Sequence, residues 1–214
     1  MVKKLYQWVA ILMVSGIIGC YPKGADLVEE LDLVYTNHDA NFDFASKHKF
    51  AIPDSVVKIT GDIFEDPDGN HRPQFMSAAS GDVILNAIKT NMTAAGWTKV
   101  DRNSNPDVLM LVSSMTTTNL YWYYDWYYWD WWYGGWYGWY YPCCYYPLYV
   151  TGYKSGSVLV QMVDASTAKP GSENVTVVWD MILNGLAEGG TSNIASRVQA
   201  GVDQAFAQSP YLKH

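Results

Sequence analysis

A dense apolar run lies near the middle of this 214-residue chain: Asp107-Val108-Leu109-Met110-Leu111-Val112. A run without polar alternation is typical of a strand in the centre of a sheet. Residues 80–96, just before it, have the clearest helical pattern, because apolar side chains recur every three or four positions and Gly96 stands where a helix C-cap glycine belongs. We expect Ser80 or Asp82 to cap this helix.

Weaker patterns extend the prediction in both directions along the chain. They indicate extended segments at 31–35, 42–59, 97–100, 156–163 and 174–183 and a second helix at 192–208. The order is strands, helix, strands, helix, and the first helix can cross over between parallel strands. The sequence therefore predicts an α+β fold: a two-layer sandwich with a mixed, largely antiparallel sheet and both helices on one face.

The overall composition limits the possible functions. Hydrophobic residues make up 49% of the chain, and the formal net charge is -7. An acidic chain with only 14 Lys+Arg lacks the basic stripe that nucleic acid requires. Three cysteines exclude a disulfide-dense scaffold and the usual four-ligand zinc site. We expect no nucleic-acid partner, no metal and no cofactor.

The N-terminus predicts export. Lys3 and Lys4 precede a mostly apolar stretch to Gly19 that is too short to cross a bilayer, so residues 1–19 are typical of a secretory signal peptide. The ending Ile17-Ile18-Gly19-Cys20 resembles the bacterial lipobox. That resemblance implies cleavage before Cys20 and lipidation of its thiol, with residues 20–30 as a lipidated tether. By the sorting rule for such lipoproteins, Tyr21 rather than Asp after Cys20 predicts the outer membrane. We expect the domain to face the periplasm, and exposure at the cell surface is the alternative. The alternative is an ordinary cleaved signal in which Cys20 is incidental.

Residues 121–149, here called the Tyr/Trp tract, form an insertion in a single domain at 31–214. The tract holds 12 of the 17 Tyr and seven of the 10 Trp. Gly134-Gly135 near its middle favours a long hairpin. The candidate interaction surface consists of Tyr121, Trp122, Trp126, Trp129, Trp131, Trp132, Trp136 and Trp139.

Three partners suit such a surface: the membrane–water interface, an envelope glycan or a protein. The alternative is a low-complexity loop that packs on itself without a ligand. Cys143 and Cys144 lie in the same tract, and in an oxidising compartment they could form a vicinal disulfide or bridge to another chain. They could equally be two thiols in a loop.

No catalytic motif emerges, so we expect a non-enzymatic binding or structural module. The histidines have no ligand spacing, and the calcium-loop reading of 66–70 fails because its terminal ligand positions would be Phe64 and Phe75. The competing hypothesis is a periplasmic hydrolase that uses acidic residues near Asp164 and Asp180. Acidic residues that close or interrupt strands more often cap turns or face solvent.

An ordered set of blocks resembles the envelope lipoproteins of the domain of unknown function 4136 family. The blocks are residues 31–37 with Phe42-Asp43-Phe44, Asn105-Pro106-Asp107, residues 156–160 ending at Asp164, Trp179 with Gly185, and residues 203–212. The resemblance covers most of the chain after the signal peptide. It implies a lipoprotein of the Gram-negative envelope with no known activity, and it transfers no catalytic residue.

Overall fold

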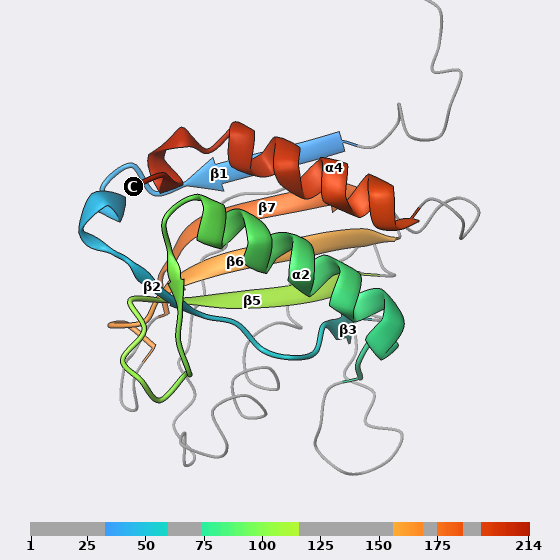
Figure 1. Ribbon diagram of the computed structural model, residues 1–214, viewed down its shortest axis with the longest axis horizontal. Coiled ribbons are helices and arrows are strands. Elements are labelled where there is room, and N and C mark those ends of the chain that lie inside the picture. Colours follow the sequence, from blue (N-terminus) through green and yellow to red (C-terminus); the bar gives the residue numbers. More distant parts are fainter. Residues whose placement is uncertain (1–32, 60–73, 116–155, 169–174, 186–193) are drawn as a thin grey trace, which may run out of the picture.

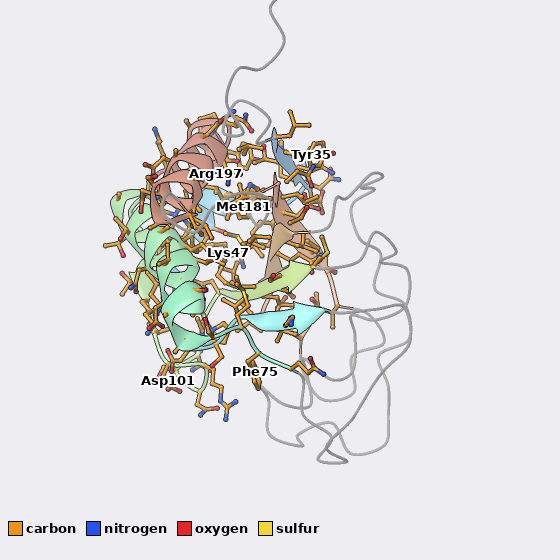
Figure 2. The ribbon with its side chains drawn as sticks, turned by 90° about the vertical axis from the view of Figure 1, so that its right-hand side faces the viewer. Tyr35, Lys47, Phe75, Asp101, Met181 and Arg197 are labelled. Carbon is orange, nitrogen blue, oxygen red and sulfur yellow. The ribbon has the colours of Figure 1, made fainter. Side chains whose placement is uncertain are left out.

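The computed structural model describes residues 33–59, 74–115, 156–168, 175–185 and 194–214. These residues form one mixed sheet with two helices on one face (Figures 1 and 2). The strands are β1 (Leu33–His38), β2 (Lys49–Ala51), β3 (Val57–Ile59), β4 (Thr98–Lys99), β5 (Val108–Met115), β6 (Ser157–Asp164) and β7 (Val177–Asn184). The helices are α2 (Ala78–Ala94) and α4 (Ile194–Ala207), with short 3-10 turns η2 (Phe44–Ser46) and η4 (Pro210–Leu212).

The sheet has the order β1-β7-β6-β5-β2-β4, and β3 also pairs with β5. The strands β1, β7, β6 and β5 pair antiparallel, whereas β2 and β3 run parallel to β5. Helix α2 provides the crossover that a parallel connection requires. The predicted α+β sandwich, with a mixed sheet and both helices on one face, is confirmed.

Two local predictions were wrong. Helix α2 begins earlier than expected: Ser77 is the N-cap, with its Oγ accepting from the Ser80 N–H at 3.4 Å, so Ser80 and Asp82 lie inside the helix. The segment around Phe44 is a 3-10 turn rather than extended, because the Asp43 carbonyl accepts from both the N–H and the hydroxyl of Ser46. The role of Gly96 is confirmed, since its φ of 98° is the left-handed conformation of a helix C-cap.

Asp107 joins the short strand β2 to the central strand β5. Its Oδ2 accepts from the backbone N–H groups of His48 and Lys49, both at 2.9 Å. Burial raises the pKa of the Asp107 carboxyl, but these two donors and the charges of Lys47 and Lys49 lower it further, below its ordinary value. The Asp at this place in the Asn-Pro-Asp block therefore has a structural role.

The hydrophobic core is divided by the sheet into two clusters. The larger cluster lies between the sheet and the helices, where Met181 of β7 points toward α4 and α2 (Figure 2). The smaller cluster lies on the opposite side of the sheet. Successive residues of β5 alternate between the two clusters, as expected for a pleated sheet: Val108, Met110 and Val112 belong to the larger one, and Leu109 and Leu111 to the smaller.

Candidate functional site

Most of the site residues predicted from the sequence lie outside the described residues. These are Cys20, Cys143 and Cys144, and the eight aromatic residues of the candidate interaction surface. The turn predicted at 66–70 also lies outside them. The proposed signal peptide, tether and Tyr/Trp tract also lie outside them. None of the described helices is long and apolar enough to span a membrane.

The structure does not bring Asp164 and Asp180 together as a carboxylate pair. Asp164 ends β6, and its Oδ1 accepts from the Ser166 N–H at 2.9 Å, which stabilises the following turn. Asp180 lies in the middle of β7, opposite Gln161. Asp164 is three residues from Gln161, or about 10 Å along the strand, and alternation directs it to the other face of the sheet.

Asp180 belongs to the face of the sheet that points away from both helices, here called the second face. The register aligns its residues in rows: one row runs Tyr35, Ile182, Leu159 and Ser113, and the next runs Asn37, Asp180, Gln161 and Leu111. The apolar members belong to the smaller core cluster, which includes Ala51, Val57, Leu109, Leu111, Met115, Leu159, Val163 and Ile182. The second face is thus mostly apolar, but it includes Asp180 and Gln161 as a polar pair, Asn37 beside Asp180, and Ser113 in the neighbouring row.

The polar pair, Asp180 and Gln161, lacks hydrogen-bond partners on two oxygens. Asp180 is 1% exposed and Gln161 is 2% exposed, yet Asp180 Oδ1 and Gln161 Oε1 accept no hydrogen bond. Burial raises the pKa of Asp180 to about 7, and a hydrogen bond from the Asn37 backbone opposes this only in part. An unpartnered buried acceptor costs about 1–3 kcal/mol. A hydrogen-bond donor placed against this pair would therefore stabilise the protein.

The chain connections that lead to the predicted tether and to the Tyr/Trp tract begin at the same end of the sheet. Leu33, the first residue of β1, pairs with Asn184, whose Oδ1 accepts from the Ser157 hydroxyl at 2.7 Å. Ser157, in turn, pairs with Met115 at the end of β5. These residues lie side by side on four adjacent strands, at the right-hand end of the sheet in Figure 1.

This arrangement places three chain connections at one end of the sheet. With neighbouring strands about 4.8 Å apart, Leu33 and Met115 are separated by roughly 14 Å. The chain leading to Cys20 departs from Leu33, and the segment containing the Tyr/Trp tract connects Met115 to Gly156. Leu33 and Tyr35 near this end are also the large hydrophobic side chains of the described residues that are exposed, at 60% and 42%.

The opposite, helix-covered face has a hydrogen-bonded arrangement that the sequence did not indicate. The indole N–H of Trp179 donates to the Ser209 hydroxyl at 2.9 Å, and that of Trp97 donates to the Leu212 carbonyl at 2.8 Å. Both rings are almost fully buried. Two buried Trp side chains therefore fix the C-terminal residues against the core, which gives the residues of the resembling block at 203–212 a packing role.

Of the three histidines among the described residues, two lie close to each other and the third stacks on a tyrosine. The rings of His48 and His214 have centroids 4.6 Å apart, and His38 stacks on Tyr211 at 3.9 Å. Burial, followed by the nearby His48, lowers the pKa of His214. Within the described ranges, no group of three or more His, Cys, Asp or Glu side chains could hold a metal ion.

Comparison with known proteins identifies the family. The family model described as Domain of unknown function (DUF4136) matches residues 34–211. The crystal structure of a DUF4136 family protein from Bacteroides thetaiotaomicron is similar with a TM-score of 0.62 and 28% identity, covering 85% of this chain and 97% of that chain. A search of the curated proteins gives no match.

Two other solved structures are similar at a lower level. A PelC dodecamer from Paraburkholderia phytofirmans has a TM-score of 0.39 and 13% identity, covering 86% of this chain and 98% of that chain. A PDZ domain protein from Parabacteroides distasonis has a TM-score of 0.41 and 17% identity, covering 86% of this chain and 37% of that chain. Because the family model spans most of the sequence, the chain belongs to the DUF4136 family of domains of unknown function.

Proposed function

We propose that this protein is a lipid-anchored, non-enzymatic module of the cell envelope whose Tyr/Trp tract contacts the membrane–water interface. The observation that carries the proposal is the common end of the sheet from which Leu33, Met115 and Ser157 lead away. A lipid on Cys20 and the tract would then act from the same side of the domain.

The distances along the chain suit this geometry. Twelve residues separate Cys20 from Leu33, so in a fully extended chain their Cα atoms are at most about 45 Å apart. A lipid on Cys20 would therefore keep the Leu33 end of the sheet within that distance of the bilayer, and the exposed Leu33 and Tyr35 lie at that end. Tyr and Trp favour the interface because their rings are apolar and their O–H or N–H groups are polar.

The anchor is tested by mass spectrometry of the mature protein isolated from the envelope. We expect a chain that begins at Cys20 and carries a thioether-linked lipid with an acylated amine. A single acyl chain binds reversibly, whereas several chains anchor stably. An uncleaved leader, or a free thiol at the mature N-terminus, would contradict the anchor.

The contact is tested with a lipid-free chain that starts at Tyr21, mixed with vesicles of phosphatidylethanolamine and phosphatidylglycerol. We expect it to co-sediment with the vesicles and to lose at least tenfold in affinity when the seven Trp residues from Trp122 to Trp139 become Ser. A matched control replaces seven exposed polar residues outside the tract and retains binding. Equal binding of the two variants would contradict the proposal.

Glycan and protein partners are the other outcomes of a parallel experiment. The lipidated protein is purified from its own envelope with and without residues 121–149. Suppose that only the tract-containing protein retains a glycan or a defined protein, and that it does not bind vesicles. The partner of the tract is then that glycan or protein and not the membrane–water interface. The hydrolase hypothesis gains no carboxylate pair from the structure, because Asp164 and Asp180 do not converge.

A further inference from the structure

We propose that the second face of the sheet is a docking surface for the Tyr/Trp tract of the same chain. This inference is independent of the proposed function, since it concerns the side of the tract that faces the domain. The outward side would remain available to the membrane interface. The argument rests on the second face itself, on the segments long enough to cover it and on the hydrogen bonds that it lacks.

The second face has the character of a covered surface. Leu111 is 0% exposed, Ile182 is 1% exposed and Leu159 is 2% exposed. Both helices, however, lie on the opposite side of the sheet (Figure 2). Among the described residues, Phe75, Ala165, Ala168 and Val175 belong to or pack against this cluster, but no described helix or strand packs across it. We therefore infer that a segment outside the described residues completes the cover.

Composition distinguishes the segments that could supply this cover. Residues 60–73 carry Asp62, Glu65, Asp66, Asp68 and Arg72, which are unsuitable against an apolar face. Residues 169–174 and 186–193 are short and rich in Gly, Ser and other polar groups. Residues 116–155 are longer and contain the aromatic tract, with only Asp125, Asp130 and Lys154 as charged residues.

The connection points and length of this segment also suit the second face. Met115 and Ser157 are paired neighbours, and the Gly156 N–H donates to the Met115 carbonyl at 2.8 Å, so both ends of the segment start beside each other. A hairpin built from its 40 residues has arms of up to about 65 Å. The eight-residue strands β5 and β6 are about 26 Å long, so such a hairpin can fold back over their full length.

The tract supplies the chemistry that the second face lacks. Asp180 Oδ1 and Gln161 Oε1 are buried acceptors without a donor, and their neighbours in the sheet are aliphatic side chains and Asn37. Tyr and Trp combine a large apolar ring with one O–H or N–H donor. A Tyr or Trp ring over this pair would bury apolar area against the sheet and give an unpaired oxygen its hydrogen bond.

The test is photo-crosslinking from either side of β1 in the full chain in detergent. Tyr35 is 42% exposed and neighbours Ile182 on the second face. Thr36 is on the other side of the strand, where its hydroxyl lies 3.4 Å from Gln208 Oε1. A benzoylphenylalanine replaces one of these residues at a time, and the crosslinked peptides are identified by mass spectrometry.

We expect the probe at position 35 to crosslink within one chain to peptides from residues 121–149, at a yield at least fivefold above that of the probe at 36. The probe at 36 should crosslink to α4. Crosslinks from position 35 to a second copy, to a copurified molecule or to no tract peptide at all would overturn the proposal. Vesicle binding could persist or fail in either case, so the two proposals are tested separately.

Discussion

The two faces of the sheet are built from the same strands. They differ in how many of their buried polar side chains find a hydrogen-bond partner among the described residues. On the helix side, Met181 and Trp179 pack beneath α4, and both buried indole N–H groups have acceptors. On the second face, Ile182 and Leu111 are equally buried, but two neighbouring side-chain oxygens have no donor. Met181 and Ile182, which are neighbours in β7, therefore face two different environments: a helix-covered core and the second face.

On the helix side, the described residues alone form a packed core. On the second face, they leave apolar side chains without a covering helix or strand. The helix face has a continuous core that holds the C-terminal residues in place, so its contacts stabilise the fold. The second face meets the strand ends that lead to the tract and the tether. Both proposals therefore concern the second face and the end of the sheet at which these connections begin.

The largest loss of stability is expected from a substitution on the helix face. Trp179→Ala should lower the free energy of unfolding by about 3–5 kcal/mol, because a fully buried ring and its hydrogen bond to Ser209 are both lost. Urea denaturation measures the change. Trp179→Phe is the control and should cost less, since it retains a ring against Phe206. A loss below about 1 kcal/mol for the Ala variant would show that the helix face is not the stable half.

Met181 and Ile182 offer a matched comparison between the faces. Each Ala substitution should cost about 2–5 kcal/mol in the full chain, because both side chains are buried. When a short Gly/Ser loop replaces residues 121–149, Met181→Ala should cost the same, but Ile182→Ala should cost less than about 1 kcal/mol since its cover has been removed. Equal costs for Ile182→Ala in both backgrounds, measured by urea denaturation, would contradict docking of the tract.

Asp180 should make stability depend on pH. In the unfolded chain the Asp180 carboxyl ionises near its ordinary value of 3.8, whereas in the folded protein its pKa is about 7. Between these values the folded state binds more protons, so stability is greatest below about pH 4, falls as pH rises to about 7 and then levels off. The total is at most about 4 kcal/mol.

Asp180→Asn should remove this part of the pH dependence, as measured by unfolding at pH 4 to 8. Asp101→Asn, at an exposed position, is the control and should leave the slope in place. An unchanged slope in the Asp180 variant would mean that the buried carboxyl does not take up a proton in this range.

The smallest stability effect is expected where the second face reaches solvent. Leu33→Ser and Tyr35→Ser together should change the free energy of unfolding by less than about 1 kcal/mol, because both side chains are exposed. Vesicle co-sedimentation of the lipid-free chain should nevertheless weaken. If stability falls strongly instead, these side chains belong to the core and do not form an exposed edge.

The sequence predicted the elements that depend on local pattern. The dense run at 107–112 and the helical spacing at 80–96 correspond to β5 and α2 because burial on one or both faces determines which residues are apolar. The cap was misplaced because the Ser residues at 77 and 80 are both good capping residues, and only the backbone shows that Ser77 precedes the first turn.

The polar pair could not be predicted from the sequence. Gln161 and Asp180 become neighbours through the register of β6 and β7, and that register includes a bulge at which Met162 pairs with Trp179 but Val163 pairs with Val177. A shift of one residue would direct Asp180 to the helix side. The common end of the sheet likewise depends on the pairing of β1 with β7, far apart in the sequence.

The most direct test of the account is the depth at which the tract meets the bilayer. The lipidated protein is placed in vesicles that carry a fluorescence quencher either at the headgroup level or at the bilayer centre, with Trp97 and Trp179 as buried internal references. We predict strong quenching of tryptophan emission by the headgroup quencher and little by the central one, with the difference lost when the seven Trp residues of the tract become Ser. Equal emission with and without the headgroup quencher would contradict the claim that the anchor and the tract act on the membrane from the same end of the sheet.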